Sequence, residues 1–145
     1  MIPMKLGCGP KIDMKNYGES LKTMMTDACF SGVLGGKPKR SVFIAGYQDN
    51  KYIYFEPHIK QKFVDTSKDD FPSKSFSCFV PRLGRFERLD SSVTIGFFCR
   101  SLAEMKQLFG RLSQIKPKIF EIVSISDKSI FKRDSTVSII IEDDL

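Results

Sequence analysis

Glu56 and His58 are the residues of this sequence whose types and spacing favour acid–base chemistry. His58 is the only histidine in the 145-residue chain, and Pro57 separates it from the carboxylate. Residues i and i+2 of an extended segment project to the same side, and the proline biases Glu56 toward extended backbone. A carboxylate beside an imidazole orients the ring and selects its tautomer. Such a pair supplies the base and the orienting acid of nucleophilic catalysis, although an incidental surface pair has the same spacing.

A predicted β-hairpin leads up to this pair. Residues 41–47 and 51–55 are rich in aromatic and β-branched side chains, and residues 48–51 join them at the length of a hairpin connection. The end of the second strand would therefore present Glu56 and His58. Residues 31–38, which precede the hairpin and contain three glycines, are predicted to form a loop.

Two helices are predicted on either side of the hairpin. Residues 16–28 and 101–115 carry apolar side chains at spacings of three and four. Ser101 and Glu104 form an S-x-x-E capping box at the start of the second helix. The buried stripe of that helix is predicted to contain Leu102, Met105, Leu108, Phe109, Leu112 and Ile115.

Further strands complete the predicted fold. They are expected at residues 1–6, 75–80, 93–99 and 118–125, with a loop over 59–74 and a helical turn over 85–89. Strands mixed with two helices predict an α+β fold with a largely antiparallel sheet. A length of 145 residues corresponds to about one domain.

The four cysteines, Cys8, Cys29, Cys78 and Cys99, form no CxxC pair. One histidine leaves no zinc-type spacing, so we expect reduced thiols and no metal site. Any of the four is a nucleophile in principle if a base lies within reach, but none stands in a local signature that indicates this role.

The net charge of +6 permits a nucleic acid, an anionic membrane or an acidic protein as partner. Nucleic-acid binding rests on this charge alone, because no basic helix or stacking-aromatic motif accompanies it, and we predict no nucleic-acid partner. No apolar run approaches the roughly 20 residues of a membrane span, and the first residues lack the apolar region of a secretory signal.

Several segments share the order and spacing of motifs in one protease family. Gly35-Gly36-Lys37-Pro38, the strand ending in Gly46-Tyr47 and the stretch from Tyr54 to His58 follow one another without a gap. They resemble the GGKP, Gly-Tyr and Tyr-Leu-Asp-Pro-His motifs of the autophagy-related cysteine proteases, or autophagins. Residues 2–7, 93–99 and 120–123 resemble further strands of that family. We therefore predict that residues 1–125 are the C-terminal part of an autophagin-type peptidase domain, and residues 126–145 are an unassigned tail.

The resemblance implies a papain-like fold, of which this chain would be one lobe. It implies acyl transfer to a cysteine thiolate, with His58 as general base and then acid and Glu56 as its orienter. Neither a metal nor an organic cofactor is implied. Gly35, Gly36, Lys37 and Pro38 would line the substrate groove, where small residues let an extended peptide approach the backbone, although a glycine-permitted turn explains them equally well.

The implied substrate is the ubiquitin-like autophagy modifier, a protein cleaved after its C-terminal glycine. The cut matures the precursor and releases the modifier from its phosphatidylethanolamine conjugate. The resemblance thus implies a cytoplasmic enzyme that contacts membranes only through its lipidated substrate.

Two departures from the family pattern affect this interpretation. Glu56 stands where the family has Asp, which lengthens the reach by roughly 1.5 Å, and catalytic groups tolerate only about 0.5 Å of misplacement. The family's Gly-Trp-Gly-Cys nucleophile segment has no counterpart here, and Cys8, although flanked by glycines, lies in the family's later half. We expect a nucleophile-bearing half that is lost, split off or encoded upstream. The alternative is an inactive remnant that only binds the modifier.

Overall fold

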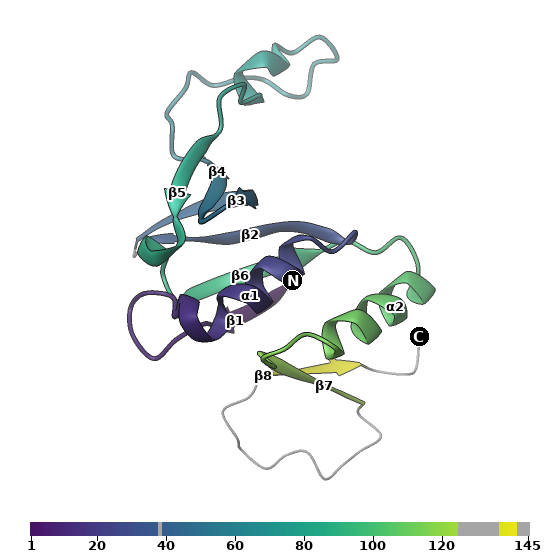
Figure 1. The fold of residues 1–145 in the computed structure, drawn as a ribbon. Coiled ribbons are helices and arrows are strands. Elements are labelled where there is room, and N and C mark those ends of the chain that lie inside the picture. The colour runs from purple at the N-terminus through teal and green to yellow at the C-terminus, as the bar shows by residue number, and fades with distance from the viewer. Residues whose placement is uncertain (38, 125–136, 142–145) are drawn as a thin grey trace.

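The computed structural model describes residues 1–37, 39–124 and 137–141 (Figure 1). The elements follow in the order β1 (Ile2–Lys5), α1 (Met14–Met25), β2 (Phe30–Lys37), β3 (Arg40–Gln48), β4 (Lys51–Phe55), β5 (Arg82–Arg85), β6 (Ser92–Phe97), α2 (Leu102–Ser113), β7 (Phe120–Ser124) and β8 (Val137–Ile141). Short 3₁₀ turns occupy Ser73–Phe76 and Phe86–Arg88, and the second of them confirms the predicted helical turn.

Strands β1 to β6 form one sheet in the order β1-β6-β2-β3-β4-β5, with every neighbouring pair antiparallel. The predicted α+β fold with an antiparallel sheet is therefore confirmed. The hairpin of β3 and β4 is also confirmed, and Asp49 in its connection has a φ of 54°. Strands β7 and β8 form a separate parallel pair, in which β8 comes from the region predicted as a tail.

Helix α1 packs against one face of the large sheet, where it contacts β2 and β3, whereas α2 contacts β7 (Figure 1). The buried core combines residues from α1, α2, the 3₁₀ turn and alternate positions of the strands: Leu21, Met24, Leu108, Leu112, Phe86, Val33, Ile44 and Ile95. The opposite face is open, because Leu34 and Phe43, which pair across β2 and β3, are 43% and 37% exposed. In the described part of the chain, neither helix has the length and apolar character needed to cross a membrane.

The two helices begin where side chains satisfy their first amides. Asp13 Oδ1 accepts from the Asn16 amide at 3.1 Å, so α1 starts two residues before the predicted boundary. Ser101 Oγ accepts from the Glu104 amide at 3.2 Å, as the capping box predicts. The Glu104 carboxylate instead accepts from the Arg100 amide, at 2.6 Å. Leu102 is 52% exposed, so its assignment to the buried stripe is wrong: as the first residue of α2, it projects past the edge of the core.

Residues 31–37 do not form the loop that is predicted over residues 31–38, because they belong to β2. Gly35 and Gly36 belong to β2, where they pair with Val42 and Ser41 of β3. Glycine weakens a strand intrinsically, but β2 lies between β3 and β6, and hydrogen bonding on both sides outweighs that preference. Pro38 lies outside the described residues.

The strand predicted over residues 75–80 is also wrong. That stretch begins within a 3₁₀ turn, and β5 starts only at Arg82, where its backbone pairs with β4. The long connection from β4 to β5 extends away from the sheet (Figure 1). Phe63 and Phe79 in this connection are 91% and 83% exposed, so the connection contributes little to the core.

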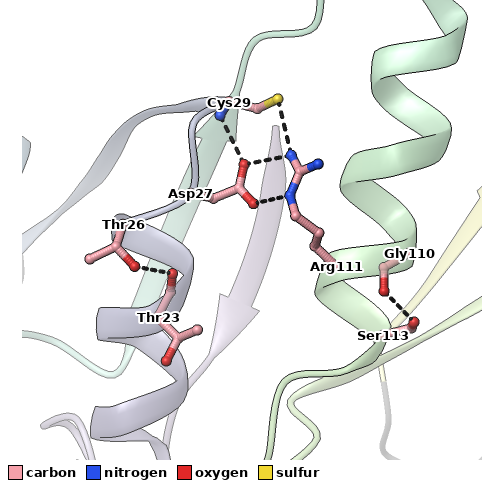
Figure 2. A network of polar contacts seen from close by, with 7 residues as sticks. All are labelled: Thr23, Thr26, Asp27, Cys29, Gly110, Arg111 and Ser113. Carbon is pink, nitrogen blue, oxygen red and sulfur yellow. Dashed lines mark hydrogen bonds and ion pairs between the residues drawn. The ribbon is translucent and has the colours of Figure 1, made fainter.

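A polar cluster joins the end of α1 to α2 (Figure 2). Arg111 donates from Nε to Asp27 Oδ2 at 2.7 Å and from Nη2 to Oδ1 at 3.0 Å. Asp27 Oδ1 also accepts from the Cys29 amide at 2.8 Å, and Arg111 Nη2 lies 3.5 Å from Cys29 Sγ. The hydrogen bonds from Arg111 lower the pKa of the Asp27 carboxyl, which stays ionised and fixes the two helices to each other.

Candidate functional site

The β3–β4 hairpin positions the Glu56–His58 pair. Strand β4 ends at Phe55, opposite Phe43 of β3, and the chain then turns through Pro57 and His58. The two side chains therefore meet across a turn, and the extended segment expected from the i, i+2 spacing is not present.

Glu56 and His58 are in direct contact in this turn. Glu56 Oε1 lies 2.5 Å from His58 Nδ1 and accepts a second hydrogen bond from the His58 amide at 3.1 Å. The Glu56 side chain is only 6% exposed, whereas that of His58 is 52% exposed. The carboxylate is thus enclosed by its partners, while the imidazole faces solvent.

Glu56 is ionised at neutral pH. The pKa of its carboxyl falls to about 2, chiefly because the His58 ring and then its amide donate hydrogen bonds, with a smaller effect from Arg40. An ionised carboxylate only accepts hydrogen bonds, so the contact assigns the ring proton to Nδ1. In the neutral ring, the other nitrogen, Nε2, then has the lone pair that a general base requires.

Arg40 is a third member of the site that the sequence analysis missed. Its Nη2 and Nε lie 2.8 and 3.0 Å from Glu56 Oε2. The register of the hairpin explains this contact. Phe43 of β3 pairs with Phe55 of β4, and this pairing places the start of β3 beside the residues that follow β4. Recognising it requires the exact register, which the sequence alone does not specify.

The predicted substrate-binding residues lie at the same end of the sheet. Gly35, Gly36 and Lys37 line an open depression of about 820 Å³, together with Lys39 and Ser41, the neighbours of Arg40 in sequence. Glu56 and His58 are not part of its lining. Gly36 has a φ of +156°, and a Cβ there would lie 2.3 Å from the Arg40 carbonyl oxygen, so only glycine fits.

The cysteines lie apart from this pair. Cys8 and Cys78 are exposed, and Cys29 is buried beside Arg111. Burial, with a contribution from Cys99, raises the pKa of the Cys29 thiol, which makes it a poor nucleophile. Among the described residues, no cysteine sulfur is hydrogen-bonded to His58, and no cluster of three or more His, Cys, Asp and Glu side chains suits a metal ion.

Comparison with known proteins identifies the class of this chain. Residues 1–111 match the family described as the peptidase C54 catalytic domain. The chain belongs to this family of cysteine peptidases, and the resemblance seen in its sequence motifs is confirmed.

Its relatives include named cysteine proteases. The chain is 38% identical over 115 residues to "Cysteine protease ATG4C" of Xenopus tropicalis, a match that covers 79% of this chain and 25% of that protein. It is 40% identical over 107 residues to ATG4C of Homo sapiens, covering 74% and 23%. It is 39% identical over 128 residues to "Cysteine protease atg4" of Dictyostelium discoideum, covering 88% and 17%. The chain therefore spans a quarter or less of the length of these relatives.

Proposed function

We propose that this chain is the histidine-bearing part of a cysteine endopeptidase of autophagy, in which His58 is the general base and Glu56 orients it. The observation that carries the proposal is the contact between the ionised Glu56 carboxylate and His58 Nδ1. It lies within the residues that match the peptidase family. The His58 side chain is 52% exposed, so a reacting group can reach it.

The proposed reaction is acyl transfer. His58 Nε2 accepts the proton of a cysteine thiol while the thiolate attacks the carbonyl carbon of the scissile bond. The imidazolium then returns the proton to the departing amine, and a water molecule, deprotonated by the same nitrogen, releases the acyl group. Glu56 accepts from Nδ1 throughout and stabilises the imidazolium. The thiol comes from a segment outside these 145 residues, as part of a papain-like fold to which residues 1–125 contribute one lobe.

The proposed substrate is the ubiquitin-like autophagy modifier, cleaved after its C-terminal glycine in the precursor and in the phosphatidylethanolamine conjugate. The open depression supports this assignment, because Gly35 and Gly36 line it and add no side chains that would obstruct an extended peptide. Lys37, which also lines the depression, would flank the peptide. The enzyme would act in the cytoplasm and meet the membrane only through its lipidated substrate.

One observation favours a second candidate function, an inactive remnant that only binds the modifier. None of the cysteines in the described residues is hydrogen-bonded to His58. A chain that has no cysteine nucleophile available would still bind the modifier but could not cleave it. The two functions differ in whether His58 contributes to cleavage when a nucleophile is supplied.

A chimera tests this difference. The 115 residues that match Xenopus tropicalis ATG4C replace the corresponding stretch of that protein, so that the relative supplies the remainder of its own domain. The substrate is the modifier extended beyond its C-terminal glycine by a reporter protein, and cleavage is followed by mass spectrometry. The chimera is expected to cleave after the glycine, and His58→Asn is expected to abolish cleavage while the chimera still melts cooperatively and binds the modifier.

Controls separate the possible outcomes. A chimera that melts cooperatively and binds the modifier but does not cleave it supports the remnant. A folded chimera that neither binds nor cleaves contradicts both functions. Cleavage that survives His58→Asn would show that His58 is not the base.

A further inference from the structure

Three hydrogen bonds and one further ion-pair contact hold the Glu56 carboxylate, with two of these contacts on each oxygen. Oε1 accepts from His58 Nδ1 and from the His58 amide. Oε2 accepts from Nε of Arg40 and lies 2.8 Å from its Nη2 in an ion pair. Arg40 is the first residue of β3, whereas Glu56 and His58 follow β4. The arginine thus binds the carboxylate from a different strand, on the oxygen that the histidine does not use.

The carboxylate needs this second attachment because of the length of its side chain. Glutamate has one more rotatable bond than aspartate and loses more rotamer freedom when it is fixed. The two bonds to His58 come from a two-residue turn, which can shift together with the side chain. Arg40 belongs to the β2–β3 ladder, where it pairs with Lys37, and a planar guanidinium restricts the direction from which an oxygen can approach.

The Arg40 side chain itself is well exposed, at 62%, and it makes no other ion pair among the described residues. Its contact is therefore not part of a larger charge network. Arg40 and His58 bind different oxygens of the carboxylate, so the arginine can hold the carboxylate in place without displacing the histidine.

We propose that Arg40 is a positioning residue, which holds Glu56 Oε2 so that Oε1 stays on His58 Nδ1 and the imidazole keeps its proton on Nδ1. Arg40 acts through Glu56 and does not touch the reacting atoms. The proposal deepens the proposed function, because it names the residue that makes glutamate a suitable orienter for that site.

The tautomer of His58 tests the proposal without any cleavage assay. The full 145-residue chain, labelled with ¹⁵N, has a single histidine, so its two ring nitrogens give one unambiguous set of NMR signals. Spectra are recorded in buffer alkaline enough to leave an imidazole neutral. The ¹⁵N shifts then report the ratio of the Nδ1–H tautomer to the Nε2–H tautomer. Backbone amide spectra establish that each variant is folded.

Arg40→Gln is expected to lower the Nδ1–H to Nε2–H ratio by about two- to tenfold, because one charge-assisted hydrogen bond is worth about a factor of ten. Arg40→Lys keeps the positive charge but lacks the planar guanidinium. Its tautomer ratio is therefore expected to lie between those of the wild type and Arg40→Gln. Arg82→Gln is the matched control: Arg82 is the first residue of β5, and no hydrogen bond or ion pair to Glu56 involves it among the described residues. It is expected to leave the ratio unchanged.

A double-mutant cycle completes the test. In the Glu56→Gln background, Arg40→Gln is expected to cause no further change in the ratio. An unchanged ratio in Arg40→Gln, or equal effects of this substitution with and without Glu56, would overturn the proposal. The NMR measurement uses no substrate, so its outcome is independent of the cleavage assay. The role proposed for Arg40 can be confirmed even if the chimera does not cleave the modifier, and it can be contradicted even if the chimera is active.

Discussion

Arg111 of α2 and Asp27, which follows α1, form a two-bonded ion pair between residues 84 positions apart in the sequence (Figure 2). The Asp27 side chain is 9% exposed, so its charge depends on this partner. We predict that Arg111→Gln lowers the melting temperature by a few degrees, because it leaves a nearly buried carboxylate with one hydrogen-bond donor, the Cys29 amide.

Thermal denaturation followed by circular dichroism measures this effect. Lys106→Gln on the same helix removes an equal charge at an exposed position and serves as the control. Equal melting temperatures for both variants would mean that the Asp27–Arg111 pair does not stabilise the fold.

The pH dependence of stability should report the environment of Glu56. Its carboxyl pKa falls from an ordinary value of 4.5 to about 2, chiefly through the hydrogen bond from the His58 ring. A lowered pKa means that folding favours the ionised form, so this contribution is complete above about pH 4.5 and is lost as the pH falls toward 2.

Urea midpoints measured between about pH 5 and pH 2 test this prediction. The wild-type midpoint is expected to fall more steeply than that of Glu56→Gln, which cannot titrate at this position. Asp27, whose pKa is also lowered, contributes equally to both proteins and cancels. Parallel curves would contradict the assignment of Glu56 as an ionised, hydrogen-bonded carboxylate.

Gly36 should not tolerate a side chain. A Cβ at this position would lie 2.3 Å from the Arg40 carbonyl oxygen, and its φ of +156° disfavours other residues. We predict that Gly36→Ala costs about 2 kcal/mol in the free energy of unfolding and displaces the start of β3. Gly46→Ala, where no atom lies within 4 Å of the added Cβ, should change stability by less than about 0.5 kcal/mol. Similar costs at the two positions would argue against the close approach of β2 and β3.

The cysteines should differ sharply in reactivity. Cys8 and Cys78 are exposed, whereas Cys29 is buried and burial raises the pKa of its thiol. We predict that a disulfide reagent modifies Cys8 and Cys78 rapidly in the native chain and modifies Cys29 only after denaturant is added. Peptide mapping by mass spectrometry identifies each site, and rapid native labelling of Cys29 would show that the cluster around Arg111 opens readily.

The cap of α2 should contribute measurably to stability. Ser101 Oγ accepts from the Glu104 amide at 3.2 Å. Ser101→Ala is expected to cost about 1 kcal/mol, and Ser101→Asp, which keeps an acceptor at the helix N-terminus, should retain most of the stability. Equal unfolding free energies for the alanine and aspartate variants would show that the cap hydrogen bond does not matter.

The sequence by itself determined the features that depend on neighbours in the chain. The β3–β4 hairpin, the capping of α2 by Ser101 and the contact of Glu56 with His58 all involve residues within a few positions of one another, or strands joined by a two-residue turn. Local propensity and spacing are sufficient for the hairpin and the cap. The proximity of Glu56 and His58 also follows from their spacing, but the two meet in a turn and not in the predicted extended segment. The family was also recognisable, because its motifs are short and follow one another in order.

The tertiary structure alone decided the features that depend on distant neighbours. The glycine-rich residues 31–38 were predicted as a loop, but β2 forms because β3 and β6 pair with it on both sides. The exposure of Leu102, the pairing of Asp27 with Arg111 and the contact of Arg40 with Glu56 follow from packing and strand register. These interactions join residues that no local pattern relates, because their energies arise only when separate elements are brought together.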